Sequence, residues 1–557
     1  MLSLRIQPNR TKVFIHRIVM SLIPIIVVAI VVLSAAYVLY GGFISRKLGI
    51  NDENITPAHK LRDDIDYMPT KTPVVLGHHF ASIAGAGPIV GPIIAVAFGW
   101  IPALIWILVG GIFFGAVHDL TSMMASIRHQ GKSIGEVIER YIGISGKNLF
   151  MVFGFATLIL IIAVFMDIVA KTFVSVPSAA SASVMFMALA VVFGVVMKKT
   201  RIPFVVLTIL GVAIMYGMVY LGTIYPIELS YWTWIIILMA YCFLAAIAPL
   251  WILLQPRDYL NSFLLYGMML LGLVGIFWAN PQIAMTSAVE FEVETLGYLF
   301  PVLFVTIACG AISGFHSMVA SGTTSKQIDR ESDAKKVGFG GMLIESLLAV
   351  VSVGTVIILT REEYISSLAD LGPVTLYSQG LGGFIASLGI AAPLAISFVA
   401  LTVSAFAVTT LDTCTRLARF LVQEQFQGSD AISARVLSGN RYIATGLVIM
   451  FSCALLFTGQ FQELWPIFGS ANQLLAAIAL LTATVWLYKT GVNPMFTLIP
   501  MVFMFVVTLT SLAIFAWKNF MASSYALAVI ALLLCALSIA LILFARKSLR
   551  AVLNENS

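Results

Sequence analysis

The sequence predicts an all-α integral membrane protein that crosses the bilayer many times. Hydrophobic residues make up 60% of the 557 residues and charged residues only 10%, and the mean hydropathy is +1.00. A soluble protein of this length needs more charge on its surface. The net charge of +6 fits basic loops beside membrane helices. Because no basic run is interleaved with aromatic residues, we expect no nucleic-acid partner.

Fifteen apolar runs are long enough to cross a bilayer. The first, residues 18–43, is too long for a cleaved signal segment, so we expect a retained helix. The others are expected at 77–98, 101–126, 149–171, 179–197, 202–223, 232–254, 260–279, 297–320, 337–360, 391–415, 441–460, 464–488, 494–517 and 523–546.

Basic residues are divided unevenly between the two sets of loops. Of the 32 Lys and Arg residues, 25 fall in alternate loops and in the C-terminal end, and seven fall on the other side. The positive-inside rule therefore places the C-terminus in the cytoplasm. Four basic residues before the first helix then lie outside, against the rule.

The segment 77–92, GHHFASIAGAGPIVGP, combines an apolar run with four glycines and two prolines. Gly85 and Gly87 permit unusual backbone angles, and Pro88 suits the first turn of a helix that restarts. From Pro88 to Phe98 a helix would span about 16 Å, half a bilayer. An interrupted helix exposes backbone N–H and C=O groups that can bind a ligand. Helix packing through small residues is the alternative explanation.

A second interruption is expected at 232–254, five spans later, where Pro249 lies inside the apolar run. Because five is an odd number, the second copy of a duplicated five-helix unit would cross the membrane in the opposite orientation to the first. An inverted repeat with interrupted first helices is typical of secondary transporters. A simple proline kink is an equal alternative at Pro249.

Several motifs together resemble the carbon starvation protein A (CstA) family over about residues 60–490. They are GHHFASIAGAGPIVGP, GAVHDL, PLWILLQPRDYL, TIACGAISGFHSMVASGTTSK, GGMLIES, TLDTCTRLARF and LWPIFGSANQLLA. The resemblance implies a bacterial inner-membrane transporter of the amino acid–polyamine–organocation superfamily, with a LeuT-like 5+5 inverted-repeat core. It also implies peptide or pyruvate uptake, the latter with proton coupling. The chain is similar to the shorter members, so the resemblance does not fix the substrate.

We expect the carboxylate of a small substrate to rest on the N–H groups of Gly87 to Ile89. The candidate substrate-binding residues flank the two expected interruptions. They are Ser82, Gly85, Ala86, Gly87, Pro88, Ile89, Pro249 and Trp251.

Ionisable and hydroxyl groups inside apolar runs are the candidates for ion coupling, because such groups are costly in a membrane. They are His78, His79, Asp119, Ser313, His316, Ser317, Glu345 and Asp412. Histidine suits a proton carrier, and Glu345 is the most suggestive carboxylate. Ser313 and Ser317 are candidates for a cation site that faces the carbonyls of Ala84 and Gly85. Interfacial contacts, helix packing and an ion pair of Asp412 with Arg416 are the structural alternatives.

The sequence thus predicts a secondary active transporter that imports pyruvate or short peptides, coupled to a proton rather than to sodium. We expect an extra N-terminal helix (1–44), a cytoplasmic segment (45–76), a transporter core (77–415) and C-terminal helices (416–557). We expect no cofactor, no metal and no catalytic residues. A cofactor-binding redox subunit and a non-transporting membrane receptor are the alternatives.

Overall fold

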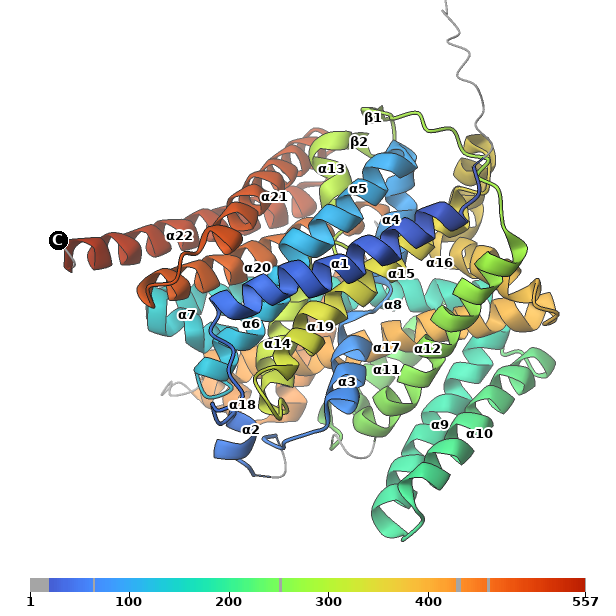
Figure 1. Cartoon of the computed structure of the whole chain (residues 1–557), viewed down its shortest axis with the longest axis horizontal. Coiled ribbons are helices and arrows are strands. Elements are labelled where there is room, and N and C mark those ends of the chain that lie inside the picture. The colour runs from blue at the N-terminus through green and yellow to red at the C-terminus, as the bar shows by residue number, and fades with distance from the viewer. Residues whose placement is uncertain (1–19, 64–65, 250–252, 427–431, 458–460, 556–557) are drawn as a thin grey trace, which may run out of the picture.

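The computed structural model describes residues 20–63, 66–249, 253–426, 432–457 and 461–555, which fold almost entirely into helices (Figure 1). Within these residues, strands form one short antiparallel pair, β1 (Glu292–Val293) and β2 (Gly297–Tyr298). The all-α class predicted from the sequence is confirmed.

Eleven of the described helices are long and apolar enough to cross a membrane, and a bent pair makes a twelfth. Each of the fifteen predicted spans overlaps a helix, so the multi-pass membrane architecture is confirmed. The long helices are α1 (Ile23–Lys47), α5 (Trp100–Gly110) with α6 (Ala116–Arg128), α8 (Ile144–Ser175), α9 (Pro177–Lys199), α10 (Phe204–Ile224), α12 (Leu254–Ala279), α15 (Gly340–Val356), α17 (Ala392–Gln425), α20 (Phe461–Lys489), α21 (Met495–Met521) and α22 (Tyr525–Glu555).

Shorter helices complete the fold. Two of them, α11 (Tyr231–Ile247) and α19 (Arg441–Leu456), are apolar. Three others lie in the connections between the long helices: α2 (Pro57–Lys60), α7 (Ile134–Ile142) and α18 (Ile432–Gly439). The segment α16 (Arg361–Ala386) has 26 residues but is kinked at Gly372.

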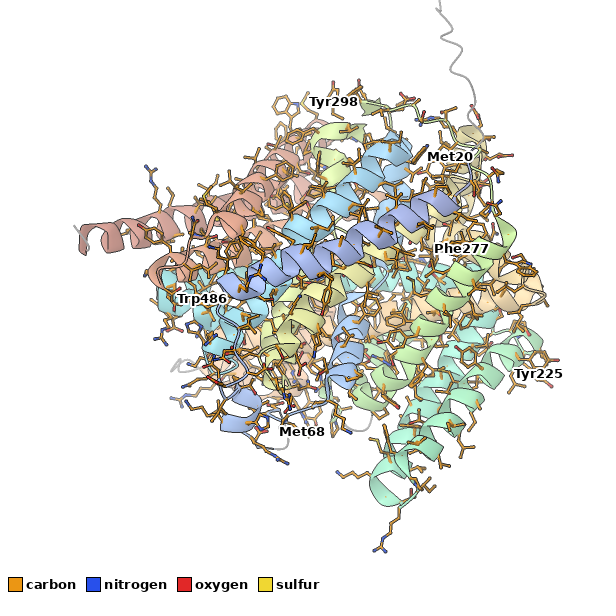
Figure 2. The ribbon with its side chains drawn as sticks, viewed as in Figure 1. Met20, Met68, Tyr225, Phe277, Tyr298 and Trp486 are labelled. Carbon is orange, nitrogen blue, oxygen red and sulfur yellow. The ribbon has the colours of Figure 1, made fainter. Side chains whose placement is uncertain are left out.

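The helices run between two ends of the molecule. Figure 2 places Met20 and Tyr298 toward one end, and Met68 and Trp486 toward the other. At the second end α1 finishes with Arg46 and Lys47. We call it the basic end.

The centre of the bundle is formed by four long helices. The most apolar part of α20 is completely buried, and those of α17, α15 and α8 are 89%, 83% and 78% buried, whereas that of α1 is only 17% buried. Figure 1 shows α9 and α10 projecting from the bundle as a hairpin. The interior that could hold a site therefore lies among α8, α17, α20 and the helices packed on them.

The first predicted interruption is present. The segment 72–98 forms α3 (Thr72–Ile83) and α4 (Gly87–Ala95), which meet at an angle of 48°. Pro88 occupies the first turn of α4, where its missing N–H breaks no helical hydrogen bond.

The second interruption was predicted in the wrong place. The helix α11 is continuous and ends at Ile247, and Pro249 follows it as part of the connection to α12. A proline disfavours the helical conformation of the residue before it, and Ala248 is extended with ψ 150°. The interruption lies instead between α13 (Leu299–Thr306) and α14 (Gly314–Gly322), inside the predicted span 297–320.

The two interrupted helices pack directly against each other. A Cβ atom at Gly91 in α4 would lie 2.3 Å from the carbonyl oxygen of Thr306, the last residue of α13. Only glycine permits this approach, because backbone atoms cannot move aside as a flexible side chain can.

We predict that Gly91→Ala lowers the stability of the protein by about 1–3 kcal/mol, the usual penalty of overpacking. Thermal unfolding of the detergent-purified protein measures the effect. Gly217→Ala in α10 is the matched control, because no atom lies within 4 Å of its added Cβ. Equal melting temperatures for the two variants would contradict the close packing of α4 on α13.

Candidate functional site

The break between α3 and α4 is enclosed by three other helices. A Cβ at Gly87 would lie 2.4 Å from the sulfur of Cys309, in the break between α13 and α14. A Cβ at Gly85 would lie 2.6 Å from the Thr410 hydroxyl in α17 and 2.8 Å from the Phe165 ring in α8. The break between α3 and α4 and the break between α13 and α14 therefore meet in the core, where α8 and α17 also contact them.

The backbone at this break offers fewer open donors than the sequence predicted. The N–H of Ile89 donates to the carbonyl of Ala86 at 3.1 Å, and Pro88 has no N–H. Among the hydrogen bonds of the described residues, none uses the N–H of Ala86 or Gly87. The open donors are thus at Ala86 and Gly87, and the prediction that included Ile89 was wrong on that point. The Ser82 hydroxyl bonds to the carbonyl of His78.

The break between α13 and α14 is completed by two amides from α20, which the sequence reasoning missed. Asn472 accepts hydrogen bonds from the N–H of Phe315 and from the Ser313 hydroxyl. Gln473 donates to the carbonyls of Phe304, at 2.6 Å, and Ile307. These amides satisfy backbone groups that the missing helical turn leaves open. Two adjacent amides inside an apolar run were the available signal.

The hydroxyls of Ser313 and Ser317, the expected cation ligands, make hydrogen bonds to other groups of the protein. Asn472 donates to the Ser313 hydroxyl at 2.9 Å, and Ser317 donates to the carbonyl of Gly314 at 2.7 Å. The described residues also hold no group of three or more His, Cys, Asp or Glu arranged to bind a metal ion.

Four ionisable side chains from three helices form a fully buried cluster, which we call the acid–histidine cluster: His118, Asp119, His316 and Glu345. One carboxylate oxygen of Asp119 lies 2.7 Å from Nδ1 of His118, and the other lies 2.9 Å from Nδ1 of His316. The opposite ring nitrogen of His316 lies 3.4 Å from Glu345. His316 thus bridges two carboxylates.

Two π-helical turns help to place these carboxylates. The turn at Gly111–Gly115 leads directly into α6 and Asp119, and the turn at Lys335–Phe339 leads into α15 and Glu345. A π turn adds a residue to the helix and rotates the side chains that follow it. Both carboxylates are thereby directed at His316 from different sides.

The cluster is incompletely satisfied. Within the described residues, neither oxygen of Glu345 has a hydrogen-bond partner, and Nε2 of His118 has none. An ionised carboxylate without hydrogen bonds is very unfavourable in a buried site. Gaining or losing a proton would therefore change the energy of this region strongly, which is the property a coupling site needs.

His78 and His79 make their hydrogen-bond and ion-pair contacts outside the cluster, although His79 is close enough to Asp119 and His316 to interact with them electrostatically. His79 is fully buried and its Nδ1 lies 2.9 Å from the Thr324 hydroxyl. His78 is partly exposed, and its Nδ1 lies 3.8 Å from Asp258.

A cavity of about 110 Å³ lies beside His78. Its lining includes Ser82, Asp258, Lys326 and Arg416. Pro249 is exposed, and Trp251 lies outside the described residues.

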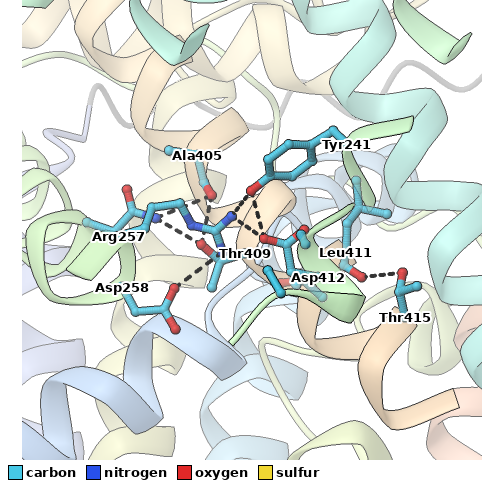
Figure 3. A network of polar contacts seen from close by, with 12 residues as sticks. Tyr241, Arg257, Asp258, Ala405, Thr409, Leu411, Asp412 and Thr415 are labelled. Carbon is cyan, nitrogen blue, oxygen red and sulfur yellow. Dashed lines mark hydrogen bonds and ion pairs between the residues drawn. The ribbon is translucent and has the colours of Figure 1, made fainter. Parts of the chain in front are cut away.

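Asp412 forms a different ion pair from the expected one (Figure 3). It binds Arg257 of α12 and the Tyr241 hydroxyl of α11, and both charged groups are buried. Arg416 instead donates to the carbonyls of Ala245 and Ala248. These carbonyls are open to it because α11 ends there, so the predicted pair of Asp412 with Arg416 was wrong.

We predict that Asp412→Leu lowers the stability of the protein by roughly 3–5 kcal/mol, because it leaves the Arg257 charge buried without this partner. The double variant Arg257→Met/Asp412→Leu removes both charges and should recover part of that loss; the recovery is incomplete because buried Asp258, 3.3 Å from Arg257, loses its partner. Thermal unfolding of the three proteins measures the coupling. A single variant as stable as the parent would contradict the pairing.

Similar proteins carry transporter names. A peptide transporter CstA of Campylobacter jejuni is 34% identical, and the match covers 88% of this chain and 79% of the relative. A peptide transporter CstA of Bacillus subtilis is 34% identical over 83% of this chain and 84% of its own length. A pyruvate/proton symporter BtsT of Escherichia coli is 29% identical over 84% of this chain and 77% of its own length.

Among solved structures, a manganese transporter of Eremococcus coleocola aligns with 88% of this chain and 99% of its own length. The identity is 13% and the TM-score is 0.49. A family model described as carbon starvation protein CstA matches residues 21–370 and 365–511. The chain belongs to the carbon starvation protein CstA family.

Proposed function

We propose that this protein is a secondary active transporter that imports a small carboxylate, pyruvate or a short peptide, together with a proton. The observation that carries the proposal is the meeting of two interrupted helices in the core, where α14 leads from one interruption straight to the acid–histidine cluster. The names of relatives, peptide transporter and pyruvate/proton symporter, support the two substrate classes.

The two interrupted helices would be the first helices of the two halves of the inverted repeat. The first half would begin at α3 and the second half at α13. This assignment makes the projecting α9–α10 hairpin an insertion. The domain division at residues 44, 76 and 415 remains a proposal. The contacts of Asn472 and Gln473 with the second interruption favour a core that continues through α20.

The substrate carboxylate would bind at the start of α4. The open N–H groups of Ala86 and Gly87 and the positive end of the helix favour an anion there. In this conformation Cys309 packs against Gly87, so binding requires α13 and α14 to move away from α4. The cavity at His78 and Ser82 would be the route toward the basic end.

The coupling proton would be held by the acid–histidine cluster. His316 lies between Asp119 and Glu345 and can carry a proton from one carboxylate to the other. His316 belongs to α14 and Glu345 to α15. A displacement of α14 would alter this contact and with it the proton affinity of Glu345, which links protonation to the movement that opens the substrate site.

The protein would lie in the bacterial inner membrane with its basic end and C-terminus in the cytoplasm. The distribution of 25 and seven basic residues supports this orientation.

We predict proton-driven pyruvate uptake into proteoliposomes. Labelled pyruvate should accumulate when the outside is acidic, and an equal sodium gradient should not replace the proton gradient. Excess di- and tripeptides serve as competitors. Uptake that peptides abolish would assign the substrate to peptides. No flux of either substrate under either gradient would contradict the proposed function.

We predict that Glu345→Gln reduces proton-driven uptake to the level of empty liposomes, because the amide cannot take up the proton. Exchange of labelled for unlabelled substrate without a gradient should persist, since the substrate site is intact.

Asp167→Asn is the matched control for this variant. Asp167 is also a buried carboxylate in a spanning helix, but it already has Lys171 at 2.9 Å and the Tyr231 hydroxyl as partners. Normal proton-driven uptake by Glu345→Gln would remove Glu345 from the coupling mechanism.

A further inference from the structure

We propose that a cavity at the basic end of α17 binds the phosphate group of an anionic lipid. The cavity has a volume of about 530 Å³ and is separate from the one beside His78. It is lined by Arg419, Gln423, Gly439, Asn440, Arg441 and Tyr442. The acid–histidine cluster and the interrupted helices contribute none of these residues, so the proposal does not depend on the transport mechanism.

Arg419 supplies a buried positive charge without a balancing carboxylate. Its side chain is 6% exposed. One guanidinium nitrogen donates to the carbonyl of Ala246, whereas Nε has no acceptor within the described residues. A buried charge is normally paired, because desolvation is otherwise too unfavourable. The guanidinium also lies 4.5 Å from the centre of the Phe420 ring, but no described carboxylate neutralises it, which indicates an anion that completes the site.

Further positive charge gathers around Arg419. Arg441 lines the same cavity from the start of α19, and Arg416 lies one turn earlier on α17. Both are close enough to interact electrostatically with Arg419. No carboxylate of the described residues lies within ion-pair distance of any of the three. Three guanidinium groups of like charge in one region repel each other, and a bound anion offsets that repulsion.

The start of α19 adds a polar wall but keeps its own donors occupied. The side chain of Asn440 accepts hydrogen bonds from the N–H groups of Tyr442 and Ile443. Arg441 donates to the Tyr442 hydroxyl. The arginines, not the helix end, are thus the groups that would bind the phosphate.

The position of the cavity favours a lipid over a phosphate from solution. It lies between the end of α17 and the start of α19, two apolar helices. This is the end of the bundle that carries most of the basic residues. Tyr442, which lines the cavity, and Phe420, which follows Arg419 in α17, are about half exposed, as is typical of aromatic side chains at the membrane interface. A lipid can place its phosphate between the arginines and its chains against these rings.

The experiment is a titration of the full-length protein, purified in a neutral detergent, with phosphatidylglycerol. Thermal unfolding reports binding. The matched lipid is phosphatidylcholine, and inorganic phosphate is the third probe. Phosphatidylglycerol should raise the melting temperature, and neither phosphatidylcholine nor inorganic phosphate at equal concentration should do so. Equal stabilisation by both lipids, or stabilisation by inorganic phosphate alone, would overturn the lipid site.

Three variants locate the binding. Arg441→Gln changes an exposed side chain and should weaken the apparent affinity about fivefold, the effect of one basic residue near an anionic surface. Arg419→Gln should weaken it at least as much.

Arg201→Gln is the control, because Arg201 is an exposed arginine in the α9–α10 connection, away from the cavity, and it should retain parental affinity. Unchanged affinity in Arg441→Gln, or equal losses in Arg441→Gln and Arg201→Gln, would overturn the assignment, whatever the folding of Arg419→Gln.

Discussion

The structure depends on one constraint: inside a membrane, a helix can be interrupted only where other parts of the protein enclose the open backbone. Both interruptions obey it by facing each other. Glycine at position 91 lets α4 touch the end of α13, and α20 supplies Asn472 and Gln473 to the second interruption. The most apolar part of α20 is completely buried, as a helix must be that bonds the open backbone of an interruption in the core.

The same enclosed region treats its buried charges in two different ways. Arg257 and Asp412 neutralise each other and have Tyr241 as a further partner, so this group joins α11, α12 and α17 firmly. Glu345 has only a histidine at 3.4 Å and no hydrogen bond within the described residues. A carboxylate paired with an arginine favours one structure, whereas a buried carboxylate without any hydrogen bond makes the structure sensitive to protonation. The first is suited to holding helices together and the second to coupling.

Part of this arrangement could be predicted from the sequence. The first interruption was predictable because Gly85, Gly87 and Pro88 each alter the backbone locally. The second was not, because 307–313 contains no proline and its hydropathy continues that of its neighbours. The open backbone there is bonded by Asn472, which lies more than 150 residues away in the sequence. The partner of Asp412 was missed for the same reason, since i,i+4 spacing predicts contacts within one helix but not across helices.

The position of α14 explains why the two sites can act together. Its first turn is held by Asn472 at the interruption and also carries His316, and Thr324, just beyond its end, lies against His79 of α3. This short helix and the residues that follow it therefore connect the break between α13 and α14, the acid–histidine cluster and the other interrupted helix. Nine residues are too few for such a helix to be stable alone, so these contacts fix its position. A change at any one of them must be accommodated at the others, so that the proposed proton on the cluster and the proposed substrate at the break would influence the same element.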